Sequence, residues 1–293
     1  MEKIDLLVID AHAQAYRAYY AMQGQNLTHP VTGQPTGAIF GFFRMLIKIL
    51  KDRSPDHVAV VWDAGKSFRA DLYKDYKATR KPMPEDLRYQ IDEIKEILKK
   101  TGFPILLEEG FEADDIMGSL AAHFGKKKKV LLLTADKDCY QLLNKNVTML
   151  RSSKGVTEFI EIHPQWVLDE LEVDVSSIPD YMALVGDASD NIPGAKGVGP
   201  KSAATLIRDY KNIEGIYKNI NKITQKALQE KLITSKENVF LSRELATINK
   251  DMPSVLSLSL ETLKCPDILA DSVIRVFKDE GYQAVALELS KIR

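Results

Sequence analysis

Three short apolar runs that each end at an aspartate constrain the fold of this chain more than any other feature. The runs span residues 4–9, 58–62 and 131–133, with Asp5 as their one polar interruption, and they lead to Asp10, Asp63 and Asp136. Apolar runs of this length without alternation indicate strands that are buried on both faces of a sheet. Because helical patterns separate the runs, the sequence predicts an α/β fold with a mainly parallel sheet flanked by helices.

The three aspartates are expected to meet at one edge of that sheet. In open α/β sheets, ligands bind at the carboxyl ends of the strands. A single aspartate after a strand commonly serves only to form a turn, and this alternative applies to each of the three. Together, however, carboxylates a few ångströms apart raise one another's pKa, and hard divalent cations relieve their repulsion. We therefore predict that Asp10, Asp63 and Asp136 share a metal site, with Asp138 available nearby.

A second group of acids opens a helix. Glu112, Asp114 and Asp115 stand at the start of an apolar pattern with helical spacing over residues 116–124, and Gly125 follows as a candidate C-cap. Acidic residues in a first turn stabilise a helix by about 0.3–1 kcal/mol, so capping alone is a sufficient alternative. Three carboxylates beside a core face nevertheless repel one another unless a cation or a proton neutralises them. For these residues alone, both interpretations stay open.

The segment between the second strand and this helix is basic and aromatic. Its basic and aromatic residues are Lys66, Phe68, Arg69, Tyr73, Lys74, Tyr76, Lys77, Arg80 and Lys81. Basic groups bind phosphates and aromatic faces stack on bases, so this composition suits a single-stranded nucleic acid. The alternative is a solvated helix face with aromatic residues in the core. Pro82 and Pro84 end the segment, and a well-patterned helix is expected over residues 85–100.

The chain becomes helical after residue 162, and two acids stand between predicted helices there. Asp187 and Asp190 follow a helix that is predicted to end near residues 185–186. Carboxylates at the negative end of a helix dipole are mildly unfavourable, and a cation would remove the conflict. They could equally be loop formers that cap the next element.

A glycine turn follows these acids. Gly197 and Gly199 free a tight turn from side-chain bulk, and Pro200 suits the first position of a helix that continues to about residue 209. Backbone N–H groups at such a helix start suit a phosphate, and Lys201 adds positive charge. The arrangement is typical of a helix-hairpin-helix that holds a duplex backbone without reading sequence. The spacing of an ATP-binding P-loop is absent.

Composition narrows the class of protein. The chain has 293 residues, of which 45% are hydrophobic and 28% charged, which describes an ordinary soluble globular protein with room for two domains. Its net charge is −1, so a nucleic-acid partner has to be recognised by local patches. Cys139 and Cys265 form no CxxC pattern, which suits a reducing cytoplasm without disulfides or a zinc site. No apolar run approaches a membrane span, so neither secretion nor membrane insertion is expected.

Taken together, these residues resemble the 5′-nuclease (flap endonuclease) family, and in particular the N-terminal 5′-3′ exonuclease domains of bacterial DNA polymerase I. Seven ordered pieces carry the resemblance over nearly the whole chain: residues 10–20, 67–69, 76–80, 111–115, 134–138, 186–191 and 197–199. The resemblance implies a PIN-like sheet followed by a helical region with a helix-hairpin-helix. The implied domains are an α/β nuclease domain over residues 1–175 and a helical DNA-binding domain over 176–293, with the hairpin motif at about 179–209.

The resemblance also implies a metal centre. Two divalent ions, Mg²⁺ or Mn²⁺, would lie among nine acids, some of which would act through water: Asp10, Asp63, Glu112, Asp114, Asp115, Asp136, Asp138, Asp187 and Asp190. Two ions about 4 Å apart can activate a water and stabilise the leaving oxygen during phosphodiester hydrolysis. Lys77 and Arg80 would be the catalytic residues that touch the scissile phosphate.

DNA contacts are implied in the same way. Residues 66–88 would form an arch over a 5′ flap, and the 5′ strand would be positioned by Tyr16, Arg17, Arg69 and Tyr76. The downstream duplex would be held by Gly197, Val198, Gly199 and Lys201. K⁺ on the carbonyl oxygens of the hairpin is a further implied ligand.

The implied function is a structure-specific 5′-3′ exonuclease or 5′-flap endonuclease of DNA replication and repair, acting as a monomer in a bacterial cytoplasm, at the nucleoid. No polymerase motif follows in the sequence, so a separate DNA polymerase and a covalently linked one are both open as partners. One alternative is a protein that binds DNA junctions without cleaving them. Another is a PIN-like ribonuclease, which would share the acidic strand ends but would have no use for the duplex-holding hairpin.

Overall fold

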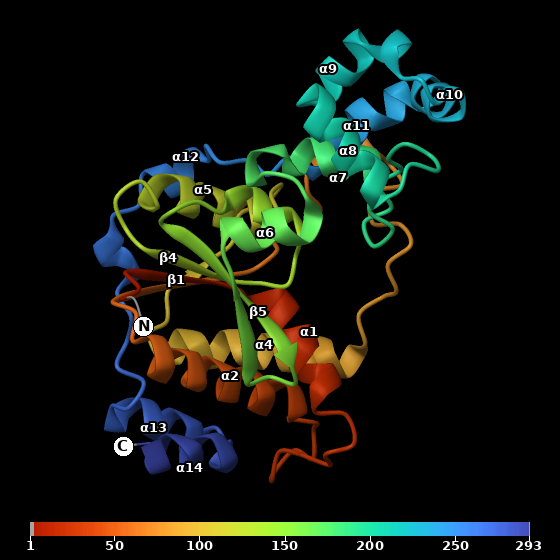
Figure 1. The fold of residues 1–293 in the computed structure, drawn as a ribbon. Helices are drawn as coiled ribbons and strands as arrows, with labels where there is room; N and C mark the ends of the chain where they lie inside the picture. Colours follow the sequence, from red (N-terminus) through yellow and green to blue (C-terminus); the bar gives the residue numbers. More distant parts are fainter. Residues whose placement is uncertain (1–2, 293) are drawn as a thin grey trace.

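A six-stranded sheet forms the centre of the computed structural model, which describes residues 3–292. Its strands are β1 (Leu6–Asp10), β2 (His57–Val61), β3 (Ile105–Leu106), β4 (Val130–Leu133), β5 (Val147–Lys154) and β6 (Glu158–Ile162). They are arranged in the order β3-β2-β1-β4-β5-β6 (Figure 1). All neighbouring strands are parallel except β6, which pairs antiparallel with β5. The predicted α/β class with a mainly parallel sheet is therefore confirmed.

Strand β1 lies between β2 and β4, and its register sets the position of the acidic edge. Asp10 is opposite Val61 of β2, and Ile9 is opposite Leu133 of β4. Every residue of β1 and β4 is buried, as the nearly continuous apolar runs predicted. Because the three strands end at the same level, the segments that follow them begin side by side at one edge of the sheet.

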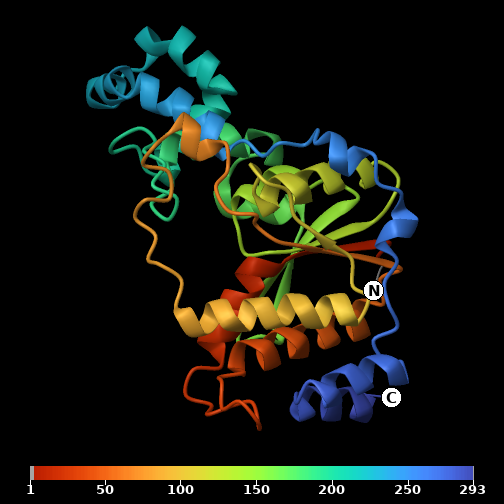
Figure 2. The ribbon, with the colours of Figure 1, turned by 180° about the vertical axis from the view of Figure 1, so that it is seen from behind.

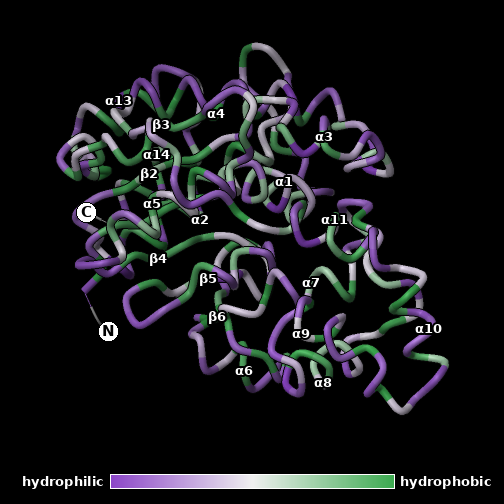
Figure 3. The backbone as a smooth tube through the Cα atoms, turned by 90° about the horizontal axis from the view of Figure 1, so that it is seen from above, coloured by the Kyte–Doolittle hydropathy of each residue, from purple (hydrophilic) through white to green (hydrophobic). Residues whose placement is uncertain are grey.

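Helices cover both faces of the sheet. One face carries α1 (Ala11–Ala21), α2 (Gly37–Arg53) and α4 (Glu85–Lys100), whereas α5 (Ala113–Phe124) and α6 (Pro164–Leu171) lie on the other (Figures 1 and 2). Alternate residues of β1 divide between two hydrophobic cores, with Leu7 and Ile9 on the α2 side and Leu6 and Val8 on the α5 side. Figure 3 shows the hydrophobic colour along the central strands and the hydrophilic colour in the outer loops.

A helical unit projects from the carboxyl edge of the sheet. It consists of α7 (Ile178–Val185), α8 (Pro200–Tyr210), α9 (Ile213–Lys218), α10 (Lys226–Thr234) and α11 (Lys236–Ala246). Helix α7 packs against α8 and α11, and α10 lies farthest from the sheet (Figure 1). The basic segment after β2 runs along the base of this unit, and only α3 (Arg69–Leu72) in it is α-helical.

The chain then returns to the α/β layers, which differs from the predicted division at residue 176. After α12 (Pro253–Leu256), helices α13 (Asp271–Asp279) and α14 (Gln283–Ile292) pack on α2 and α4. The ring of Phe277 meets Phe43 with centroids 4.9 Å apart, and Arg44 pairs with Glu288 at 3.1 Å. The apolar face of α13 needs a partner that only the tertiary fold supplies. Helices α12, α13 and α14 all pack on the α/β layers, so the predicted boundary at residue 176 does not separate them from those layers. No helix within residues 3–292 is long and apolar enough to cross a membrane.

Candidate active site

The first acid of the site is Asp10, at the carboxyl end of β1. Its Oδ1 accepts a hydrogen bond from the backbone N–H of Ala13 at 3.0 Å, so Asp10 also caps α1. Its Oδ2 accepts from the hydroxyl of Thr134 at 2.9 Å. Asp63 follows β2, and its Oδ1 accepts from the N–H of Ala113 at 2.8 Å. Asp10 and Asp63 therefore also have structural roles as acceptors of backbone hydrogen bonds, as the alternative interpretation held.

The loop after β4 contributes two more carboxylates. Asp136 accepts from the N–H of Asp138 at 2.9 Å, and its own N–H donates to Thr134 at 3.1 Å, which fixes the loop. The Oδ1 atom of Asp138 is buried and has no hydrogen-bond partner among the described residues. A buried carboxylate oxygen without a donor is energetically unfavourable unless it is protonated or meets a cation.

The start of α5 faces the same loop. Asp114 accepts a weak hydrogen bond from the thiol of Cys139, with a sulfur–oxygen distance of 3.4 Å. Burial, followed by the charges of Asp136 and Asp10, raises the pKa of Asp114 well above its ordinary value of 3.8. These electrostatic effects indicate that carboxylates from β1, the β4 loop and α5 share one site.

Burial raises the pKa values of the neighbouring acids as well. The pKa of Asp10 is raised to about 7, first by burial and then by the charge of Asp63, while the hydrogen bond from Ala13 opposes the change. Burial and the charge of Asp136 raise the pKa of Asp138 well above 3.8. The mutual repulsion that the sequence predicted is therefore present in the fold.

Glu112 and Asp190 are held by basic side chains of the segment after β2. Lys77 places its Nζ 2.8 Å from Glu112 Oε1 and 3.6 Å from Asp190 Oδ2. Arg80 forms an ion pair with Asp190 as well. The hydroxyl of Tyr76 lies between the two acids and donates to either at 3.1 and 3.2 Å, while its ring lies 4.9 Å below the Lys77 ammonium. Asp190 thus brings the loop after α7 to the predicted site.

Asp115 lies outside this acidic group and pairs with Arg69. Its two oxygens accept from Arg69 at 2.7 and 2.8 Å, and the pair is completely shielded from solvent on the aspartate side. Although burial lowers the pKa of Arg69, the hydrogen bond and charge of Asp115 raise it above its ordinary value. This pairing does not support Asp115 as a metal ligand or Arg69 as a DNA contact, because each neutralises the other in the core, and both roles stay predictions.

Three further predicted residues differ in their surroundings. Asp187 lies in the loop after α7, where it accepts from the N–H of Ser189 at 2.7 Å in a local turn, which agrees with the loop-former alternative. Its charge nevertheless contributes to the raised pKa of Asp138. Arg17 donates from Nε to the carbonyl of Gly155 at 2.7 Å. Tyr16 lies along the cleft beside Asp10.

A cleft of about 590 Å³ joins most of these groups. Its walls come from β1, α1, the basic segment and α5, and the lining residues include Asp10, Tyr16, Asp63, Lys77, Arg80, Glu112, Asp114 and Asp136. The Lys77 and Arg80 side chains lie among these acids, where they pair with Glu112 and Asp190. Such a cleft suits an anionic ligand that binds the basic side chains directly and the carboxylates through cations.

The donor atoms at this site are of the kind that binds divalent metal ions, although the side chains are not arranged as a complete coordination site. Within residues 3–292, no three carboxylate, imidazole or thiol side chains are already arranged around one point. Lys77 and Arg80 instead neutralise Glu112 and Asp190. The remaining donors are carboxylate oxygens, which Mg²⁺ and Mn²⁺ prefer, and Asp138 Oδ1 is buried without a partner. Ion binding would satisfy that oxygen and lower the raised pKa values.

The predicted hairpin lies between α7 and α8. Gly197 has φ +80°, a conformation that favours glycine, and Gly199 precedes the first turn of α8. Lys201 is exposed on that turn, whereas the side chain of Val198 is buried. Val198 can therefore offer only its backbone to DNA.

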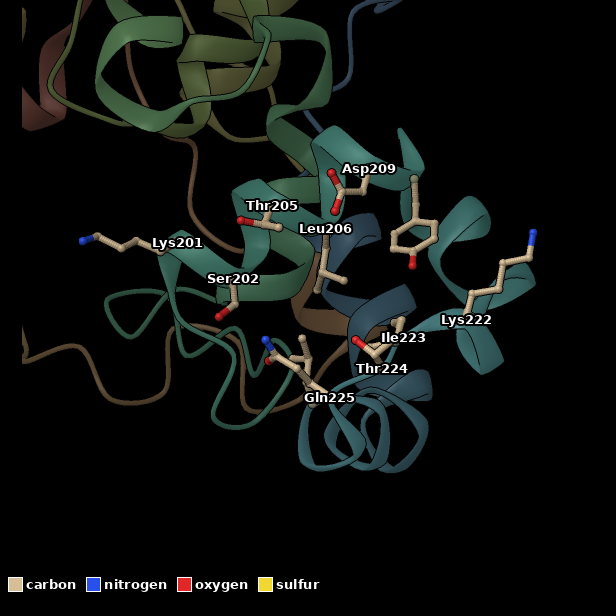
Figure 4. Close-up of a pocket in the computed structure, with 11 residues that line it drawn as sticks. Lys201, Ser202, Thr205, Leu206, Asp209, Lys222, Ile223, Thr224 and Gln225 are labelled. Carbon is tan, nitrogen blue, oxygen red and sulfur yellow. The ribbon is translucent and has the colours of Figure 1, made fainter.

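A second cavity of about 280 Å³ lies between α8 and residues 222–228. Figure 4 shows Ser202, Thr205 and Gln225 around it, with Lys201 and Lys222 extending outward at opposite ends. Asp209 is its single acid, and the cavity lies away from the carboxylate cluster. Apart from Asp209, hydroxyl, amide, lysine and apolar groups line the cavity and supply no cluster of carboxylates, so the chemistry belongs to the first cleft.

Sequence reasoning missed three supporting residues. Thr134 orients Asp10, Ser67 donates from Oγ to Glu112 at 3.0 Å, and His12 lies 3.5 Å from Asp63. Thr134 and Ser67 stood inside the matching pieces 134–138 and 67–69, which was the available signal. His12 likewise stood inside the matching piece 10–20.

Comparisons with known proteins agree with this architecture. The family model of the 5′-3′ exonuclease N-terminal resolvase-like domain matches residues 5–172, and that of the 5′-3′ exonuclease C-terminal SAM fold matches residues 173–270. The DNA polymerase I of Caldicellulosiruptor bescii is 41% identical over 263 residues, which cover 88% of this chain and 30% of that protein. The DNA polymerase I of Deinococcus radiodurans is 40% identical over 266 residues, covering 89% and 27%. The chain thus spans under a third of the length of these two relatives.

Solved structures show the same fold. A zinc-bound T5 5′-exonuclease aligns with a TM-score of 0.68 at 23% identity, covering 96% of this chain and 99% of its own. The catalytic core of Rad2 in complex with a DNA substrate aligns with a TM-score of 0.61 at 18% identity, covering 98% and 91%. At these identities the likeness concerns the fold, and it confirms a mostly parallel sheet followed by a helical region.

Proposed function

Because the chain belongs to the 5′-3′ exonuclease family, we propose that it hydrolyses phosphodiester bonds of DNA at a 5′ end or a 5′ flap. One observation carries the proposal. Carboxylates from four separate segments line or adjoin one cleft, and Lys77 and Arg80 line the same cleft and pair with Glu112 and Asp190. An anionic backbone can enter such a cleft only if cations neutralise the acids, which is the condition for metal-dependent hydrolysis.

We propose the metal ligands from the same carboxylates. Asp10, Asp114, Asp136 and Asp138 form the inner group, and Asp63, Glu112, Asp187 and Asp190 surround it directly or through water. When bound, two Mg²⁺ or Mn²⁺ ions supply charge neutralisation for the phosphate and lower the pKa of the attacking water. Asp115 is left out because Arg69 occupies both of its oxygens.

The basic side chains act on the substrate. Lys77 is only about a quarter exposed and has φ +58°, so its ammonium is held at the acids by the backbone as well as by Tyr76. We infer that Lys77 and Arg80 leave their carboxylate partners to bind the scissile phosphate. Fixed positive groups there stabilise the charge that develops in phosphoryl transfer. The segment around residues 66–88 would cover the 5′ strand.

The hairpin of the helical unit supplies the duplex contact. Backbone N–H groups at Gly199 and the first turn of α8, together with Lys201, suit a phosphate of either strand and read no sequence. A duplex bound there would place its 5′ end toward the cleft. This proposal extends to removal of flaps or primers in replication and repair, by a monomer that works with a DNA polymerase, whether covalently linked or separate.

A cleavage assay tests the proposal. A 5′-labelled flap DNA, the same duplex without a flap, and a single-stranded RNA are incubated with the protein in Mg²⁺ and in EDTA. We expect metal-dependent cleavage of the flap near its junction and weak cleavage of the RNA. Binding without cleavage in Mg²⁺ and Mn²⁺ would favour a junction-binding protein. Equal cleavage of RNA and flap would favour a ribonuclease.

A further inference from the structure

Side chains of α10, of α11 and of Ser235 between them contact the hairpin between α7 and α8. The hydroxyl of Ser242 accepts from the N–H of Gly194 at 2.9 Å, and that of Ser235 accepts from the N–H of Lys196 at 3.2 Å. The third contact has the opposite polarity, because it brings a donor to the hairpin. Lys231 of α10 donates from Nζ to the carbonyl oxygen of Gly197 at 3.0 Å.

Lys231 also packs on the glycine that it contacts. A Cβ atom at Gly197 would lie 3.1 Å from Nζ and 3.2 Å from Cε of Lys231. Glycine is therefore needed at position 197 for two reasons. It adopts φ +80°, and it leaves room for the side chain of Lys231. Within residues 3–292, Lys231 pairs with no carboxylate, so two of its three N–H donors remain for a ligand.

This contact conflicts with a potassium ion at the hairpin. The resemblance implied K⁺ on the hairpin carbonyls, but the Gly197 carbonyl already accepts from an ammonium group. Two cations a few ångströms apart repel each other, so this carbonyl does not favour K⁺ while Lys231 is present.

We propose that Lys231 is the built-in cation of the hairpin, which replaces K⁺ and binds a phosphate of the duplex beside Gly197. The proposal rests on the proposed function, because its ligand is duplex DNA. It adds a phosphate-binding residue from α10, an element that the sequence pattern did not connect to the hairpin. It also predicts that duplex binding by this chain does not depend on which monovalent cation is present.

The test measures binding rather than cleavage. Fluorescence anisotropy follows a flap DNA bound to the full chain in Ca²⁺, with KCl or NaCl at equal ionic strength. For the unchanged chain we expect the same affinity in both salts. Lys231→Met should weaken binding several-fold, lower the slope of log affinity against log salt by about 0.9, and make K⁺ better than Na⁺. Lys231→Arg should keep the salt slope.

Lys226→Met is the matched control. Lys226 opens the same helix, is exposed, and has no hydrogen bond or ion pair with a described residue. Equal effects of Lys231→Met and Lys226→Met, or a clear K⁺ preference in the unchanged chain, would overturn the inference. Failure of the proposed function is distinguishable, because the unchanged chain would then neither bind the flap tightly nor cleave it in Mg²⁺.

Discussion

Arg69 and Asp115 form a two-pronged ion pair that joins the basic segment, the acidic helix and the end of α11. Two guanidinium nitrogens donate to the carboxylate at 2.7 and 2.8 Å. The same guanidinium donates to the backbone carbonyls of Leu245 at 2.7 Å and Thr247 at 3.0 Å. The pair therefore fixes the helical unit to the N-terminus of α5, on which Glu112 and Asp114 are carried.

Removing one member of this pair should destabilise the whole protein. Asp115→Ala leaves the Arg69 charge buried and unpaired, and we expect the free energy of unfolding to fall by about 3–5 kcal/mol. Urea denaturation measures it. Asp71→Ala, which breaks the exposed pair with Lys66, should cost less than about 1 kcal/mol. If the Asp115→Ala protein kept its stability but lost metal binding, the result would show that Asp115 is a metal ligand after all.

Asp136 should be needed for cleavage but not for DNA binding. Asp136→Asn keeps an oxygen that can accept from the N–H of Asp138, so the loop is preserved while the negative charge is lost. We expect the single-turnover cleavage rate to fall more than about 100-fold, because the charge helps to hold the metal. Flap affinity in Ca²⁺ should stay within a few-fold. Parallel loss of folding and binding would mark Asp136 as structural.

Lys77 should act mainly on the chemical step. Lys77→Ala removes the ammonium group that lies 2.8 Å from Glu112, and the single-turnover rate should fall by about 10²–10³-fold. Flap affinity should change much less. Lys74, which is exposed on the same segment, provides the control as Lys74→Ala. A loss of affinity as large as the loss of rate would show that Lys77 only binds.

The metal-free protein should become less stable as the pH rises from about 4 to about 7. Asp10 keeps its proton in the folded protein up to a pKa of about 7, against an ordinary value of 3.8. In this window the folded state binds more protons than the unfolded chain, so the free energy of unfolding falls with increasing pH. Asp10→Asn should stabilise the protein in EDTA near neutral pH by roughly 1–3 kcal/mol, since the amide oxygen still accepts from Ala13.

Urea denaturation in EDTA at acidic and neutral pH measures this effect. The difference in free energy of unfolding between Asp10→Asn and the unchanged chain should shrink toward low pH. There Asp10 is protonated in both the folded and the unfolded chain. A variant that is less stable than the unchanged chain at neutral pH would show that the Asp10 charge is favourable without metal. Added Mg²⁺ should stabilise only the unchanged chain.

The strands and the site's acidic edge could be predicted because their causes are local. Nearly continuous apolar runs identified β1, β2 and β4, and parallel pairing then required Asp10, Asp63 and Asp136 to follow at one edge. The helix over residues 85–100 was also predicted to the residue, because its proline start and apolar face are both in the sequence. These features depend on neighbours within a few positions or on general rules of topology.

The partners of charged side chains could not be predicted in the same way. Nothing in residues 111–115 distinguishes Asp114, which faces the acids, from Asp115, which turns to Arg69 across 46 positions. The contact of Lys231 with Gly197 and the return of α13 onto α2 likewise depend on how helices are placed in space. Such long-range pairings follow from the tertiary fold.

The central claim is that these carboxylates gather divalent ions, and a Mn²⁺ titration followed by electron paramagnetic resonance tests it most directly. The signal of free Mn²⁺ gives the number of ions bound by the unchanged chain and by the Asp114→Asn/Asp136→Asn variant. The account predicts two ions per unchanged chain and the loss of at least one in the variant. No bound Mn²⁺ at concentrations that support cleavage, or equal binding by both proteins, would contradict it.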